Sequence, residues 1–158
     1  MTKNAQGWGF DILIASMLFL LAIILFYFYT LNNSPESEET YQALSYDGDI
    51  IADVLLSPGY PENWDSSNVI TPGILTGNKI NDTKLENFYN LAQTNYEKSK
   101  SLFNTRYNYY VNLSVPIIIN TQIDGIGNKP VEPKNLIKTT RFTIYNNTLV
   151  SLNVYIWD

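Results

Sequence analysis

The sequence predicts an α+β protein in which a long N-terminal membrane helix precedes a small head of helices packed on an antiparallel β-sheet. Three observations support this prediction. An uncharged apolar run covers residues 12–31, helical spacing of apolar residues follows it, and strand-type alternation begins at Arg106. We therefore place a short leader at 1–7, the membrane helix at 8–31 and an extracellular head at 32–158.

The composition argues against several classes of function. The 158 residues include 10 Lys and Arg, 15 Asp and Glu, and no His or Cys, so the formal net charge is -5. Thiol nucleophiles, disulfides, Cys/His metal sites and imidazole bases are therefore excluded. The scattered basic residues argue against a nucleic-acid partner. We expect a structural or binding protein without a cofactor, not an enzyme.

The run ILIASMLFLLAIILFYFYTL at 12–31 is long enough to span a membrane as a helix. It ends in the aromatic residues 26–29, which suit the membrane interface. A secretory signal peptide has a shorter apolar core and a small-residue cleavage site, and a buried core helix needs a larger protein around it. The run is therefore predicted to remain as a membrane helix.

The flanking charges predict the orientation. Lys3 precedes the run, whereas residues 32–78 contain eight acidic residues and no Lys or Arg. Positive charge favours the cytoplasmic side, so we expect a cytoplasmic N terminus and an extracellular head. Four Asn-x-Ser/Thr triplets agree with export, and each is a candidate for an N-linked glycan. They begin at Asn32, Asn81, Asn112 and Asn146.

The leader combines Lys3 with small or amide residues, and Asp11 stands at the start of the apolar run. Further segments are SPGYPENWDSSNVITPGIL from Ser57, KLENFYNL from Lys84, YEKSKSLF from Tyr96, RYNYYVNLSV from Arg106 and RFTIYNNTLVSLNVYIWD from Arg141. Together they resemble the archaeal type IV pilin-like proteins with class III signal sequences. The resemblance covers most of the chain, and the GYPENW segment is its most distinctive element.

The resemblance implies that a membrane peptidase removes the leader near Ala5, Gln6 or Gly7. It also implies that Asp11 pairs with the new amino terminus of a neighbouring subunit during assembly. The usual family residue is Glu, and Asp11 becomes the fifth residue only after a cut between Gln6 and Gly7. The implied partners are copies of itself or related pilins, the assembly machinery and the membrane. The implied assembly residues are Asp11, Phe10, Ile12, Ala15, Ser16, Phe19, Ala22 and Ile23.

From the residues alone, Asp11 has a simpler reading as a solvated cap. A carboxylate near the start of a helix is stabilised by the free N–H groups and by the helix dipole.

In the head we predict a helix at 34–56 capped by Ser34, a loop at 57–81, helices within 82–104 and a β-sheet within 106–158. The first helix should bury one stripe of apolar residues. The segment Asp47-Gly48-Asp49 interrupts this stripe and is read as a solvated face instead of a calcium loop. Asn146-Asn147 predicts a tight hairpin turn between two strands. The stripe consists of Tyr41, Leu44, Ile51, Val54 and Leu55.

The loop at 57–81 contains the aromatic residues Tyr60 and Trp64 among Pro and Gly. It is too long for a bare connection. Either both aromatic side chains enter the core and the loop is an ordered cover, or they offer their faces to a sugar or a neighbouring subunit.

Three functions remain open from the sequence. The favoured one is a pilin-like subunit of an extracellular filament or pseudopilus. The second is a single-pass surface protein that acts in adhesion or binding, or as a minor part of an export machine, without polymerising. The third is an ectoenzyme with Glu62 and Asp65 as its acid and base. The acidic residues 32–78 and the more basic residues 79–158 should also attract each other, within one subunit or between subunits.

Overall fold

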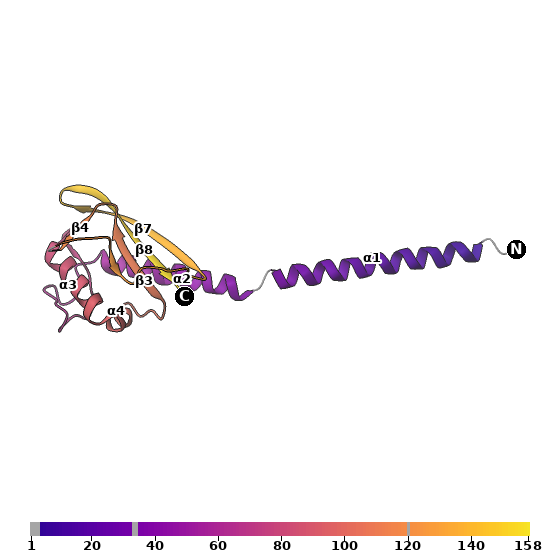
Figure 1. Ribbon diagram of the computed structural model, residues 1–158, viewed down its shortest axis with the longest axis horizontal. Helices are drawn as coiled ribbons and strands as arrows, with labels where there is room; N and C mark the ends of the chain where they lie inside the picture. Colours follow the sequence, from indigo (N-terminus) through magenta and orange to yellow (C-terminus); the bar gives the residue numbers. More distant parts are fainter. Residues whose placement is uncertain (1–3, 33–34, 120) are drawn as a thin grey trace. The chain divides into compact units, whose positions relative to one another are not determined.

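The computed structural model describes residues 4–32, 35–119 and 121–158 (Figure 1). The chain consists of two compact units, Met1–Glu38 and Glu39–Asp158. The second unit is called the head below. The prediction of an α+β protein is confirmed, because a long apolar helix is followed by helices packed on a six-stranded, mostly antiparallel sheet. The predicted cap Ser34 lies outside the described residues.

The first helix, α1, covers Asn4–Asn32. It therefore begins before the membrane segment expected at 8–31. Leu, Ile, Ala and Phe dominate it, and none of its interior residues from 10 to 31 is Gly or Pro. Of the described helices, α1 alone is long and apolar enough to cross a membrane, over Gly9–Leu31. This property is consistent with a membrane anchor or with a signal sequence.

The second helix, α2, covers Pro35–Leu55, within one residue of the predicted end. Leu44, Ile51 and Leu55 are fully buried, whereas Tyr41 is 42% exposed and leaves the predicted stripe. The apolar stripe turns α2 towards the sheet, as its spacing predicts.

Gly48 explains the interruption of that stripe. A Cβ atom at this position would lie 3.0 Å from Thr139 Oγ1 and 3.3 Å from Ile156 Cγ2. The glycine therefore lets the helix approach the sheet closely. The flanking carboxylates make side-chain contacts instead of facing only solvent. Asp47 accepts a hydrogen bond from Thr105 at 2.7 Å, and Asp49 pairs with Arg141 at 3.0 Å.

The main sheet has the strand order β1-β2-β7-β8-β3-β6. Its centre is the long hairpin of β7 and β8 (Figure 1), whose turn residues Asn146 and Asn147 have φ angles of 50° and 61°. These positive angles are those of the hairpin turn that the two asparagines predicted. The strands are β1 (Leu75–Thr76), β2 (Lys79–Ile80), β3 (Asn108–Leu113), β6 (Ile126–Gly127), β7 (Leu136–Tyr145) and β8 (Thr148–Trp157).

Three short elements differ from the sequence expectations. The segment 57–81, expected as a loop, ends in the hairpin of β1 and β2, and β2 pairs with β7 in parallel. The strand-rich run RYNYYVNLSVPIII extends from Arg106 to residue 119, but the strand that it begins ends at Leu113. Pro116 follows it, and proline cannot donate to a sheet ladder. Two further strands, β4 (Ile117–Ile119) and β5 (Thr121–Ile123), form a separate hairpin.

Two more helices, α3 (Asp82–Thr94) and α4 (Tyr96–Leu102), pack on the same face of the sheet as α2. Asn81 and Asn95 cap their N termini by accepting bonds from the backbone N–H groups of Lys84 and Lys98. The face that carries these helices is called the inner face. The opposite one is the outer face.

Tyr109 on β3 is the centre of the aromatic core. Its ring stacks on Tyr96 and Phe88 at centroid distances of 5.1 and 6.2 Å, and meets the edge of Phe103 at 5.3 Å. Its hydroxyl lies 2.5 Å from Ser99 Oγ. The ring is fully buried. The inner face is therefore held together by aromatic packing, and the hydroxyls of Tyr109 and Tyr96 add polar contacts at its centre.

The buried tyrosines predict a loss of stability in alkaline solution. Burial raises the pKa of Tyr109 above its ordinary value of 10.0, so the folded head keeps the proton where the unfolded chain releases it. The stabilisation is complete below pH 10.0 and is lost as the pH rises further. The melting temperature of the full chain in micelles, followed by near-ultraviolet circular dichroism, should fall above this pH. Tyr109→Phe should flatten that fall, and an unchanged slope would contradict the assignment.

Candidate functional site

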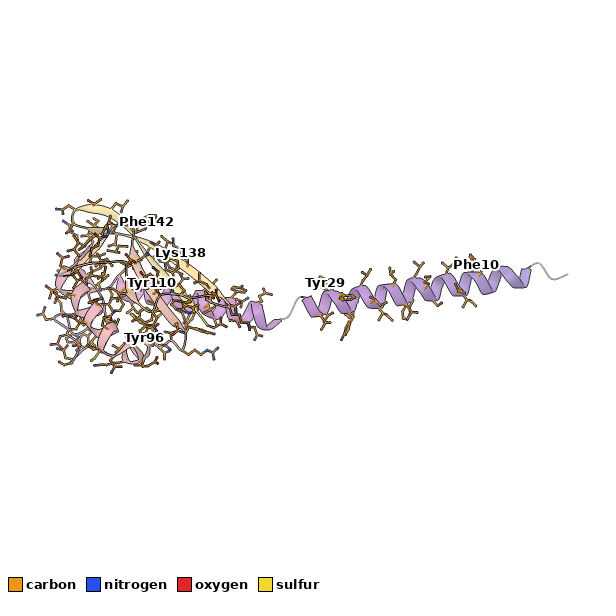
Figure 2. The ribbon with its side chains drawn as sticks, in the orientation of Figure 1. Phe10, Tyr29, Tyr96, Tyr110, Lys138 and Phe142 are labelled. Atoms are coloured by element: carbon orange, nitrogen blue, oxygen red, sulfur yellow. The ribbon has the colours of Figure 1, made fainter. Side chains whose placement is uncertain are left out.

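The surface of α1 is the first candidate site. Its large apolar side chains from Phe10 to Leu31 are between 42% and 71% exposed, and they point in all directions around the helix. Figure 2 shows this at Phe10 and Tyr29. A helix that is apolar on every side is stable only when lipid or other protein surrounds it. α1 is therefore a surface for a membrane, for other helices, or for both in turn.

The aliphatic hydroxyl groups of this surface, those of Ser16 and Thr30, are satisfied within the helix. Ser16 Oγ donates to the carbonyl of Leu13, and Thr30 Oγ1 donates to the carbonyl of Phe26, both at 2.9 Å. Internal bonds of this kind reduce the cost of placing a hydroxyl in an apolar environment. Neither residue needs a partner from outside the helix.

Asp11 is different. It is exposed, and it has no hydrogen bond or ion pair with any residue that the structure describes. It is the eighth residue of α1, which begins at Asn4, so it lies beyond the first turn and its free N–H groups. The reading as a solvated cap is therefore wrong for this helix. Asp11 is a carboxylate on the side of an apolar surface.

The helix sorts the predicted assembly residues into separate stripes. Asp11, Ala15 and Ala22 lie at spacings of four and seven, which places them on one face of α1. A second, neighbouring stripe consists of Ile12, Ser16, Phe19 and Ile23. Phe10 lies apart from both stripes. The carboxylate thus shares its face with the two alanines of the span. The predicted cleavage residues Ala5, Gln6 and Gly7 lie in the first turn of α1.

The two aromatic residues of the loop after α2 separate in the structure. Trp64 is 1% exposed, and its Nε1 donates to the carbonyl of Gly73 at 2.7 Å. Tyr60 is 63% exposed. The loop is therefore an ordered cover, and of its two aromatic side chains Trp64 enters the core. Tyr60 is the aromatic side chain that it presents to solvent.

Lys84 on α3 holds this cover in place. Its side chain is buried, and its Nζ donates to the carbonyls of Pro58 and Leu75 at 2.8 and 2.9 Å. Asn87, one turn further, donates to the carbonyl of Trp64 at 2.9 Å. Lys84 cannot be identified from the sequence, because one lysine in an amphipathic helix has no pattern that distinguishes a buried role from an exposed one.

Asp65, a candidate acid or base, stabilises a turn. Its Oδ1 accepts hydrogen bonds from the hydroxyl and backbone N–H of Ser67, at 2.6 and 2.7 Å, and from the N–H of Asn68. These bonds, led by the Ser67 hydroxyl, hold the pKa of this exposed carboxyl below its ordinary value. Asp65 thus stays ionised, whereas a general acid needs a raised pKa. Within the described residues, no cluster of three Asp or Glu side chains can hold a metal ion.

The four glycan candidates lie in different settings. The Asn81 side chain is the N-cap of α3, and Asn112 is in β3 with its Oδ1 accepting from Asn153 at 3.0 Å. Asn146 is exposed in the β7–β8 turn. Asn32 is the last residue of α1. Asn146 is therefore the most accessible of the three whose side chains are described.

The attraction between acidic and basic segments occurs within the head. Arg141 on β7 contacts Asp49 and Asp53 of α2 at 3.0 and 3.4 Å.

Comparison with protein-family models, with curated proteins and with solved structures finds no match for this chain. Its architecture of a long apolar helix followed by a mixed α/β head is compatible with a pilin-like subunit.

Proposed function

We propose that this protein is a pilin-like structural subunit of an extracellular type IV pilus-like filament or pseudopilus. The observation that carries the proposal is Asp11, which has no partner among the described residues and lies on a helix whose large apolar side chains are exposed on every side. A simple anchor gains nothing from this charge, because a carboxylate at the hydrocarbon boundary costs free energy. A subunit that must pair with a neighbour does gain from it.

Burial of α1 drives assembly in this proposal. Each helix leaves lipid and enters a bundle of other α1 helices, where packing and exclusion of water stabilise it. Ala15 and Ala22 allow helices to approach closely on the face that also carries Asp11. Asp11 pairs there with the processed amino terminus of a neighbouring subunit, which neutralises both charges and sets the axial register.

The remaining parts of the proposal follow from this assembly. The N terminus lies in the cytoplasm before processing, and the head becomes the outer surface of the filament. The partners are copies of this chain or related pilins, the membrane, a leader peptidase and the assembly machinery. The protein has no catalytic activity, and N-linked glycans are attached to exposed sequons such as Asn146.

N-terminal sequencing and intact mass of protein sheared from the surface of native cells test the proposal. A filament subunit should begin at Gln6, Gly7 or Trp8, and excess mass should count its glycans. A chain in the membrane fraction that keeps its leader and never appears in sheared material would overturn it. That result would leave a single-pass surface protein anchored by α1.

A further inference from the structure

A cavity of about 550 Å³ opens on the outer face of the head. Its walls come from β3 and β8 on one side and from residues 114–130 on the other. All of its lining residues belong to the head, whereas the assembly residues of α1 belong to the other unit. The helices cover the inner face, whereas this cavity opens on the face that they leave free.

Asn112 presents a free amide to the cavity. Thr140 donates to Asn153 Oδ1 at 3.0 Å, and Asn153 Nδ2 donates to Asn112 Oδ1 at 3.0 Å, so a ladder of polar side chains crosses three strands. The ladder uses the oxygen of Asn112. Its Nδ2 has no hydrogen-bond partner among the described residues, and the side chain lines the cavity. The amide is thus oriented to donate to a ligand.

Two tyrosines form the aromatic part of the wall. The rings of Tyr110 and Tyr155 have centroids 6.2 Å apart at a tilt of 47°. Lys138 Nζ lies 5.5 Å from the Tyr155 centroid; Figure 2 labels Lys138 and Tyr110 on the head. Gly125 lies against Tyr110, since a Cβ there would be 2.5 Å from Tyr110 Cζ. Packing on both rings holds the aromatic wall in one arrangement.

The charge of the wall is balanced. Asp124 and Lys129 are the charged residues among its described lining, and they lie 3.8 Å apart. Ser114 and Gln122 add a hydroxyl and a second amide. A wall without net charge selects neither anions nor cations, whereas its many donors and acceptors favour a ligand with several hydroxyl groups.

We propose that this cavity binds a neutral sugar. A pyranose has an apolar C–H face, which suits a tyrosine ring, and a rim of hydroxyls, which suits amides and a carboxylate. A peptide would need paired backbone donors and acceptors or a net charge to match, and the charged residues of the described lining, Asp124 and Lys129, balance each other. The site goes beyond the filament function and does not depend on it.

The sugar can reach the cavity from two sources. It can belong to a glycan on another molecule, or to a glycan attached to this chain, because Asn112 begins an Asn-Leu-Ser triplet and its free Nδ2 faces the cavity wall. Both sources bring the same C–H face and hydroxyl groups to the cavity. Binding by unglycosylated protein identifies the first source, and a hexose mass on the Asn112 peptide of native protein identifies the second.

The test uses the full chain from a host without N-glycosylation, held in micelles of a detergent without a sugar headgroup. An array of neutral oligosaccharides is probed, and each positive is repeated in solution by saturation-transfer NMR. We expect Tyr155→Leu and Gln122→Ala to weaken binding about tenfold. Tyr46→Leu is the matched control, because Tyr46 is 67% exposed on α2 and lies outside the cavity.

The Gln122 side chain is exposed and has no hydrogen bond with another described residue, so its variant separates lost binding from lost folding. Sugar binding that all three variants retain would overturn the proposal. So would the absence of array binding together with an unmodified Asn112 in native protein. If members of a peptide library bind at this cavity and the sugars do not, the sugar proposal is overturned and the ligand is a peptide. None of these results bears on the N-terminal sequencing that tests leader processing, so the two proposals can fail separately.

Discussion

Trp64→Ala is expected to lower the free energy of unfolding of the head by about 3–5 kcal/mol. The indole is 1% exposed, and its Nε1 donates to the Gly73 carbonyl at 2.7 Å. Truncation leaves a cavity and removes the donor from that carbonyl. The loss is large because the same contact holds the cover formed by the loop after α2.

Urea unfolding of the full chain in neutral micelles, followed by the near-ultraviolet circular dichroism of the tyrosines, measures this effect. Ile70→Ala is the matched control, since Ile70 is an apolar residue of the same loop but is 61% exposed. It should change the free energy of unfolding by less than about 0.5 kcal/mol. Equal losses in the two variants would show that Trp64 is not the residue that anchors the cover.

The sequence predicted the structure best where the spacing of apolar residues, or the preference of a residue for a turn, agrees with the burial that the fold requires. The apolar run of α1 needs only its length to be recognised, and Asn146-Asn147 predicted its hairpin turn because both residues tolerate positive φ angles. Leu85, Phe88 and Leu91 lie at helical spacing and are all buried. In each case a few neighbouring residues are sufficient to predict the element.

The remaining features depend on residues far apart in the chain. Gly48 breaks an apolar stripe, and only its distance from Thr139 shows that it allows close packing. Tyr110 is on the polar side of the alternation in β3, yet it is 7% exposed, because residues near Gly125 fold over it. The parallel pairing of β2 with β7 likewise joins strands that no local pattern connects. The outer cavity therefore could not be predicted from the sequence.

Asp11→Ala is expected to abolish filaments while the protein remains in the membrane. The apolar surface of α1 is unchanged or increased by this substitution, so membrane insertion persists. Assembly fails because the amino terminus of the neighbouring subunit loses its counter-charge inside a bundle of apolar helices. A buried charge without a partner costs several kcal/mol. Filament yield, measured by shearing, sedimentation and electron microscopy, should fall below detection.

Three further variants separate charge from shape. Asp11→Asn keeps the size but removes the charge and should also fail, whereas Asp11→Glu keeps a carboxylate and should restore filaments. Thr30→Ala is the matched control, because Thr30 is not among the implied assembly residues and its hydroxyl donates to the Phe26 carbonyl of its own helix. Normal filaments from Asp11→Asn would mean that the charge has no part in assembly. Equal loss in Thr30→Ala would mean that any change in this helix disturbs the bundle, and the specific role of Asp11 would then be refuted.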